Sequence, residues 1–284
     1  MRYRNKNNIN LFNNPLKREV SNLELKNSLE SKWYDLESED AYKQLEVKSD
    51  LLPMDMEFEN WFADFYDNNS IELQYDRDFA YFSSFPHGNN LRFLELGFGN
   101  GCLSRFFIRR NIEVHSCEIS RAYARFLVQT EPLANVASSC AEILPFKNDS
   151  FDIVTTFMAL HHFNLDLTLP EIIRVLKPGG RGIFMEPLLN SKILYMLRQI
   201  IPIKDNESPG GGGINSHEIE SRLQNAGVQY NMREFEFFTR LERLPFLNKF
   251  QIVLRKIDFA ILSRSRFLRH YSRTAVIEIC KPAR

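Results

Sequence analysis

Three glycines at alternate positions follow a short apolar segment that contains one acid. Residues 93–101 have the sequence Phe-Leu-Glu-Leu-Gly-Phe-Gly-Asn-Gly, and residues 102–110 have the character of a helix. The pattern predicts a buried parallel strand that turns tightly into a helix, without Cβ atoms where a ligand comes close. Open α/β sheets bind nucleotides at such turns, beyond the carboxyl ends of their strands. A dinucleotide fingerprint would place its third glycine at 102, where Cys102 stands.

Three later segments extend this pattern. Residues 113–119 predict a second short strand that ends near Glu118, where nucleotide-binding βαβ units place an acid that accepts hydrogen bonds from ribose hydroxyls. The alternative interpretation is that Glu118 binds no ligand and is a solvated charge at the end of the strand. The other two segments are residues 140–154 and the pair of stretches 159–163 and 171–181.

The last of these stretches predicts how a helix meets a strand. Apolar residues between 169 and 176 recur at helical spacing, and Pro178-Gly179-Gly180 follows them. Proline forbids continuation of the helix, and the glycines permit a left-handed cap and a sharp reversal into a buried strand over 182–186. The succession of strands and helices from 92 to 187 predicts a doubly wound α/β sheet.

Taken in order, the four segments resemble class I S-adenosylmethionine-dependent methyltransferases, and within them the type 11, ubiquinone-biosynthesis-like branch. The resemblance spans about residues 92–187, roughly a third of the chain. It implies a Rossmann-like, seven-stranded sheet whose last strand pair is antiparallel, and S-adenosylmethionine as cofactor. It also implies methyl transfer to an O, N or C nucleophile of a small-molecule or lipid-linked acceptor.

The resemblance assigns cofactor-binding residues at the matching positions. Around the glycine loop it implies that the backbone approaches the methionine part and that an acid lies near the amino group of the cofactor; these residues are Glu95, Gly97, Phe98, Gly99 and Gly101. Farther along it implies contacts with the ribose (Glu118), the adenine (Ile119, Ala141, Glu142) and the methionine part (the Phe157 backbone). Cys140 stands where the family usually has an acid, a departure that affects the contact with the adenine amino group.

Two histidines are the candidates for catalysis. His161 and His162 follow the predicted fourth strand, at the edge of the sheet where the methyl group is expected. Oxygen and carbon nucleophiles usually need a base, and imidazole is suited to that task near neutral pH. The pair could equally pack against the cofactor or cap the following helix. Glu186 ends the fifth predicted strand, where it faces the crevice or serves as an acid at a helix start.

Two other functions stay open. An NAD(P)-dependent oxidoreductase is disfavoured because the third glycine is at 101 and not at 102. A non-catalytic cofactor-binding or scaffold protein would bind the cofactor without transferring its methyl group.

The chain divides into three predicted parts. Residues 1–21 are asparagine-rich and predicted to be disordered, residues 22–88 to form a helical cap beside the substrate pocket, and residues 89–284 to form the methyltransferase domain. Within that domain, residues 228–237 and 274–280 predict the two final strands, with a helical insertion over 240–271 between them.

A zero net charge hides a strong asymmetry. Residues 21–76 carry fifteen acidic and four basic side chains, whereas residues 240–284 carry eleven basic and three acidic ones. The two regions could simply attract each other across the fold. Alternatively, the basic and apolar stretch 249–271 contacts an anionic membrane surface or an acidic substrate. The absence of excess positive charge argues against nucleic acid as a partner, and the oligomeric state is left open.

The four cysteines are scattered and lack the spacing of a metal site. Reduced thiols of this kind predict a cytoplasmic protein. The polar start of the chain predicts neither a signal peptide nor a transmembrane helix.

Overall fold

The computed structural model describes residues 23–24, 26–32, 35, 53–67, 71–88, 90–191, 212–239 and 246–283. The predicted tail over 1–21 and the first residues of the predicted insertion, 240–245, lie outside these ranges.

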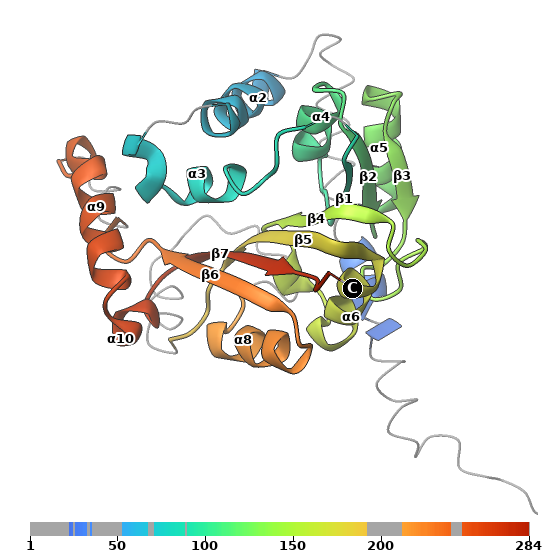
Figure 1. Ribbon diagram of the computed structural model, residues 1–284. Coiled ribbons are helices and arrows are strands. Elements are labelled where there is room, and N and C mark those ends of the chain that lie inside the picture. Colours follow the sequence, from blue (N-terminus) through green and yellow to red (C-terminus); the bar gives the residue numbers. More distant parts are fainter. Residues whose placement is uncertain are drawn as a thin grey trace, which may run out of the picture.

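A seven-stranded sheet forms the centre of the described structure, in the order β3-β2-β1-β4-β5-β7-β6 (Figure 1). Strands β1 to β5 are parallel, and β7 runs antiparallel to both β5 and β6. This confirms the predicted Rossmann-like α/β fold and its antiparallel last pair. The strands are β1 Arg92–Leu96, β2 Glu113–Glu118, β3 Asn135–Ser138, β4 Phe151–Phe157, β5 Leu176–Pro187, β6 Gln229–Phe235 and β7 Thr274–Cys280.

Helices cover both faces of the sheet. One face carries α2 (Pro53–Tyr66), α3 (Arg77–Phe82) and α4 (Cys102–Ile108), and the other carries α6 (Leu165–Val175) and α8 (Ser216–Asn225) (Figure 1). The helix α5 (Arg121–Thr130) packs beside β3, and the short helices η1 (Ile71–Tyr75) and η2 (Leu160–His162) precede α3 and α6. Between β6 and β7 lie η4 (Asn248–Phe250), α9 (Gln251–Leu262) and α10 (Arg266–Arg269), which confirms a helical insertion there.

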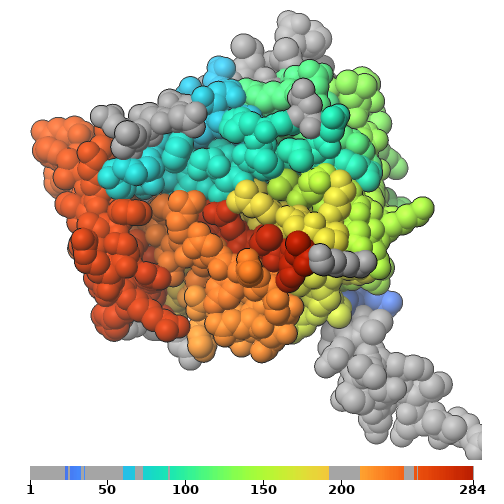
Figure 2. All heavy atoms as spheres, viewed as in Figure 1, coloured from blue at the N-terminus to red at the C-terminus, as the bar shows by residue number. Residues whose placement is uncertain are grey.

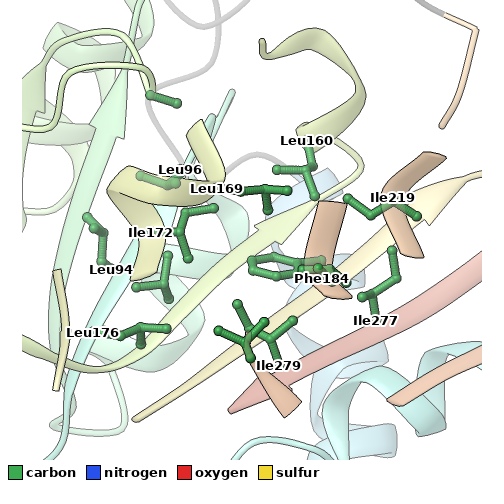
Figure 3. Close-up of a cluster of buried hydrophobic side chains, with 14 of the residues drawn as sticks. Leu94, Leu96, Leu160, Leu169, Ile172, Leu176, Phe184, Ile219, Ile277 and Ile279 are labelled. Atoms are coloured by element: carbon green, nitrogen blue, oxygen red, sulfur yellow. The ribbon is translucent and has the colours of Figure 1, made fainter. Parts of the chain in front are cut away.

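Each face of the sheet has its own core. The core under α6 and α8 is aliphatic and surrounds Phe184; Figure 3 shows its residues Leu94, Leu96, Leu169, Ile172, Ile277 and Ile279 converging from strands and helices. The core under α2, α3 and α4 is aromatic, with Phe62, Tyr81, Phe82, Phe85, Phe93, Phe106 and Phe107 buried together. Aromatic side chains bury about 150–250 Å² each. The predicted cap is therefore packed firmly onto the sheet in its described part, while its boundaries at 22 and 88 stay predictions.

The junction between α6 and β5 differs from its prediction. No glycine caps α6; its C-cap is Leu176, whose backbone is already extended, and the strand begins at that residue. The reversal lies inside β5 instead. Leu176 pairs with Phe151 whereas Arg181 pairs with Ile153, so the extra residues bulge out, and Gly179 among them has φ +78°. The Pro-Gly-Gly sequence thus shapes a bulge in the strand.

Candidate active site

The glycine loop after β1 uses its three glycines for two purposes. Gly97 and Gly101 have positive φ, and a Cβ atom on either would lie 2.8 Å from a neighbouring side chain, Ala159 or Leu127 respectively. These two glycines allow close packing. Gly99 also has positive φ, but an added Cβ would meet nothing within 4 Å. Its backbone therefore borders open space at the carboxyl edge of the sheet.

That open space is a hollow of about 260 Å³ beyond the carboxyl ends of β1, β2 and β4. Most of the predicted site residues line it: Glu95, Gly97, Phe98, Gly99, Glu118, Ile119, Phe157 and His162. An adjoining hollow of about 20 Å³ is lined by Ala141 and Glu142, and it shares Gly97, Glu118 and Ile119 with the larger one. Neither hollow is lined by Gly101, which is the N-cap of α4, or by His161. We call the two hollows together the loop hollow.

Glu118 is the central acid of the loop hollow. Its side chain is buried and accepts hydrogen bonds from the backbone N–H groups of Gly99 (3.0 Å), Ile119 (2.8 Å) and Ser120 (3.0 Å). A carboxylate offers about four acceptor positions, so one is left for a ligand. Burial is the largest influence on this group and raises the pKa of Glu118, while the backbone donors act in the opposite direction.

Glu95 is buried at the end of β1. Ser104 of α4 donates to it at 2.5 Å, and desolvation raises the pKa of Glu95 to about 8. A cationic ligand group would favour its ionised form. Glu142 is held differently, because its Oε1 accepts from the backbone N–H of Asn164 at 2.8 Å and so ties the loop after β3 to the start of α6.

The structure separates the roles of the two histidines. His161 Nδ1 lies 2.8 Å from Glu186 Oε2, and His161 does not line the loop hollow. The buried Glu186 also accepts from the backbone N–H groups of Ala159, Leu160 and His161, so it anchors the turn that begins η2. His162 lines the hollow, and burial lowers its pKa to about 3, which keeps the imidazole neutral.

The first residues of the predicted helical cap close one side of the site, through side chains that the sequence motifs did not name. We call the helical residues 23, 24, 26–32 and 35 the cap segment. Ser31 donates to the carbonyl of Ile119 at 3.1 Å, Asp35 accepts from Ser120 at 2.6 Å, and Lys26 donates to the carbonyl of His162. The cap segment thus crosses from the loop after β2 to the loop after β4. Its position depends on contacts between residues about ninety or more apart, which local motifs do not reveal.

The cap segment brings a further carboxyl group to the loop hollow. Glu30 lines both of its parts, is 5% exposed, and has a pKa that burial raises to about 7. Its Oε1 lies 3.9 Å from both Lys26 and His162 and makes no hydrogen bond within the described part of the chain. A buried acceptor of this kind is costly unless a ligand satisfies it.

A larger cavity, of about 540 Å³, lies along the edge strand β6 between α3, η1 and α9. We call it the edge cavity. Because β6 is antiparallel to β7, and β7 to β5, the end of β6 lies at the same edge of the sheet as the ends of β4 and β5. Trp61 lines the edge cavity, and its ring packs 6.2 Å from that of Phe157, which lines the loop hollow. An aromatic wall therefore separates the two.

The loop hollow fits S-adenosylmethionine by its donors, acceptors and shape. The open face at Gly99 admits a ligand against the backbone, and the spare acceptor position of Glu118 suits a ribose hydroxyl. The buried carboxyl groups of Glu30 and Glu95 suit a ligand that carries positive charge on an ammonium and a sulfonium group. Among the described residues no group of three or more His, Cys, Asp or Glu side chains is arranged to hold a metal ion.

Two further findings bear on the surroundings of the protein. The four cysteines are free, with Cys117 buried in β2 and Cys280 half-buried in β7, and the cytoplasmic location predicted from them stays a prediction. Within the described ranges, no helix has both the length and the apolar character needed to cross a bilayer.

Comparisons with known proteins agree with this geometry. Residues 94–184 match the family model Methyltransf_11, described as a methyltransferase domain. A demethylmenaquinone methyltransferase of Streptomyces avermitilis is 31% identical over 120 residues, which cover 39% of this chain and 52% of the relative. The human mitochondrial arginine-hydroxylase NDUFAF5 is 31% identical over 121 residues, 42% of this chain and 34% of the relative. The chain thus spans about half or less of the length of these curated relatives, and their names do not agree on one reaction.

Similar solved structures include the [4+2]-cyclase SpnF, at a TM-score of 0.48 and 16% identity, over 80% of this chain and 81% of that one. A phosphoethanolamine N-methyltransferase of Haemonchus contortus gives 0.48 at 17% identity, over 79% of this chain and 57% of that one. The fold assignment rests on the strand order and not on these scores. With that strand order, the glycine loop and the match over 94–184, this chain contains a class I S-adenosylmethionine-dependent methyltransferase domain.

Proposed function

We propose that the protein transfers a methyl group from S-adenosylmethionine to an O, N or C nucleophile of a small-molecule or lipid-linked acceptor. The observation that carries this proposal is the loop hollow itself. Open space at the Gly99 backbone is bordered by three buried carboxyl groups, of Glu30, Glu95 and Glu118. NADH and NADPH have no cationic group to match them, and the pyrophosphate of every nicotinamide dinucleotide is negatively charged.

The proposed roles of the residues follow from their positions. S-adenosylmethionine, when bound, supplies an electrophilic methyl group. Glu118 holds the ribose, Glu95 faces the amino group, and Ala141 with Glu142 borders the adenine. Phe157 and Met158 also line the hollow, and Met158 has the uncommon φ of +57°. A residue held in this conformation is typical of a functional turn.

His162 is the better placed of the two candidate bases. It lines the loop hollow, and its neutral imidazole can accept a hydrogen bond from an acceptor hydroxyl or amine. A pKa of about 3 makes it a weak base, so general-base action requires that a bound ligand raise this pKa toward neutrality. His161 acts as a positioning residue in this proposal, since Glu186 holds it at 2.8 Å beside the His162 ring. Correct alignment of nucleophile and methyl group is the larger part of what the protein contributes.

We place the acceptor in the edge cavity. That cavity lies at the same edge of the sheet and has room for a small molecule. Its wall mixes aromatic rings, such as Trp61 and Phe259, with charged groups of both signs, such as Arg77 and Glu234. This mixture favours an amphiphilic acceptor. Access to the methyl group requires a shift of the Trp61 and Phe157 side chains, which separate the two spaces.

Thermal unfolding with added ligands tests the cofactor. S-adenosylmethionine and S-adenosylhomocysteine should each raise the melting temperature by several degrees, because a ligand at about a hundred times its Kd adds about 2.7 kcal/mol. NADH and NADPH should have no effect. A shift with the nicotinamides alone would instead support the oxidoreductase.

Transfer is tested separately, with radiolabelled methyl groups and a panel of amphiphilic quinols, amines and phenols. Label in any acceptor that requires the protein supports the enzyme. Cofactor binding without transfer to any member of a broad panel would favour the non-catalytic alternative.

A further inference from the structure

Helix α9 differs from an ordinary surface helix in how its charged and apolar residues are distributed between its two faces. Its inward face carries the buried Asp258 together with Arg255, while its outward face carries Ile252, Val253 and Ile257, all more than 40% exposed. Surface helices normally present charged residues to water and apolar residues to the core. The outward face of α9 therefore has the composition of a contact surface.

The charged side chains on the inward face of α9 make specific contacts within the protein. Asp258 accepts hydrogen bonds from the backbone N–H groups of Phe237, Phe238 and Thr239, at 2.6–3.0 Å. Arg255 pairs with Asp76 of the loop before α3. These contacts fix the rotation of α9 about its axis, so its apolar outward face is a consequence of specific bonds and not of a loosely attached helix.

The neighbouring segments continue the exposed apolar surface. Of the thirteen large hydrophobic side chains that are exposed among the described residues, seven lie between 246 and 267. Phe267 of α10 is 71% exposed and Phe246 is 65% exposed. We call this surface the α9 face; its apolar members are Phe246, Phe250, Ile252, Val253, Ile257, Phe259 and Phe267. In Figure 2 the red segment that bears it forms one side of the molecule, at the left of the view.

The exposed charged side chains of residues 246–267 are all basic. Lys249, Lys256, Arg264 and Arg266 are exposed within it, and the only acid between 246 and 277 is the buried Asp258. Lys249 and Lys256 lie against aromatic rings, and Arg264 donates to the carbonyl of Ala260. Arg266 lies 3.9 Å from Glu220 of α8 but is 86% exposed. The surface is thus both apolar and positively charged.

We propose that the α9 face binds the surface of an anionic phospholipid bilayer. Apolar side chains flanked by lysine and arginine are the combination that binds in the headgroup region, where acyl chains accept the former and anionic headgroups attract the latter. A second copy of the chain fits less well, because two α9 faces brought together would oppose their positive charges.

The orientation has a consequence that rests on the proposed function. The inner side of α9 lines the edge cavity through Asp258 and Leu262. When the protein binds the bilayer through the α9 face, the edge cavity therefore lies next to the bilayer surface. An amphiphilic acceptor could then reach the cavity directly from the membrane.

Vesicle sedimentation with the full chain tests the membrane contact. Binding should be strong with vesicles that contain phosphatidylglycerol, weak with phosphatidylcholine alone, and reduced by salt. The double variant Lys256→Gln/Arg264→Gln should lower the partition coefficient about 30-fold, since each basic residue contributes about 1 kcal/mol near such a surface. The double variant Val253→Ser/Ile257→Ser should lower it about tenfold or more.

Matched controls lie on and beside α5, at the opposite side of the molecule (Figure 1). Arg121→Gln/Arg125→Gln removes two exposed charges from a helix, and Val128→Ser/Leu133→Ser removes two exposed apolar residues. Both controls should bind vesicles like the unmodified protein. Binding of S-adenosylmethionine by every variant, measured in parallel, reports on folding and on the proposed function independently of the membrane.

Three outcomes would overturn the proposal. One is the absence of sedimentation with anionic vesicles, and another is sedimentation that the α9 variants and the α5 controls change equally. The third is a dimer in solution that Val253→Ser/Ile257→Ser converts to a monomer, without any vesicle binding, since the α9 face would then be covered by a second copy.

Discussion

The loop hollow and the edge cavity are built from opposite kinds of polar contact. In the loop hollow, Glu118 and Glu142 are held by backbone N–H groups, Glu118 by those of Gly99, Ile119 and Ser120. Along the edge cavity, side chains mostly hold one another across long separations in the chain. Arg77 pairs with Glu236 at 3.0 Å, and Arg255 pairs with Asp76. The first arrangement is a property of one loop, whereas the second depends on how distant segments pack.

This difference separates a site of fixed geometry from one that tolerates substitution. A carboxylate bound by its own loop cannot change without disturbing the loop, so such a site suits one fixed ligand. Partly exposed ion pairs contribute little to stability, typically about 0–1 kcal/mol, and can be replaced without unfolding the protein. The comparison therefore predicts severe effects of substitution in the loop hollow and selective effects in the edge cavity.

The largest effect should come from Glu118→Ala. It removes the expected ribose contact and also leaves three backbone donors at the glycine loop without their acceptor. Affinity for S-adenosylmethionine should fall at least about 100-fold, since hydrogen bonds to charged groups contribute about 1.5–3 kcal/mol each. Isothermal titration calorimetry measures it. The control Glu113→Ala, at the exposed start of the same strand, should bind normally, and normal binding by Glu118→Ala would refute the assigned role.

Substitution of His162 by Ala should lower kcat about 100-fold and leave cofactor affinity within a few-fold, because removal of a positioned base typically costs that much. The pKa of about 3 also predicts that no loss of rate near pH 6–7 arises from protonation of this residue. His161→Ala should affect kcat less. A larger loss for His161→Ala than for His162→Ala would reverse the two roles.

Asp258→Ala tests a carboxylate at the edge cavity that is held by three backbone groups. Its loss leaves the N–H groups of Phe237, Phe238 and Thr239 without an acceptor, and should lower the free energy of unfolding by about 3 kcal/mol. Cofactor affinity should stay unchanged. Denaturant titration measures the effect, and a change below about 1 kcal/mol would mean that the loop is held by other contacts.

The buried acids of the loop hollow predict a pH dependence of stability. The pKa of Glu95 is raised to about 8 and that of Glu30 to about 7. Because the folded state keeps these protons where the unfolded chain has lost them, this stabilisation is present below about pH 4.5 and is lost as pH rises toward 8. Glu95→Gln should remove part of that loss, on the order of 2 kcal/mol between pH 5 and 8.5. Identical pH profiles of melting temperature for the two proteins would contradict the raised pKa.

The same contrast explains what the sequence could predict. Gly97, Gly99, Glu118 and His162 belong to short segments whose local geometry is encoded locally, and they lie together in the structure as predicted. Glu30 belongs to no motif, because its place in the hollow depends on packing against loops far along the chain. The sequence also indicated apolar and basic character over 249–271 without revealing that the apolar side faces outward. That orientation is set by Asp258 and its bonds to the end of β6.

Arg233→Gln should have the smallest effect on the protein and a selective effect on the reaction. Arg233 lines the edge cavity and donates through one terminal nitrogen to the carbonyl of Ala80, at 3.1 Å. Its buried Nε has no hydrogen-bond partner within the described ranges. We expect the free energy of unfolding to change by less than about 1 kcal/mol, because the ion pair with Glu278 is long and partly exposed.

The KM for the methyl acceptor should rise about tenfold in Arg233→Gln, as expected for one lost hydrogen bond, with cofactor affinity unchanged. An unchanged KM would place the acceptor outside the edge cavity, whereas a parallel loss of cofactor affinity would show that the two spaces do not act separately.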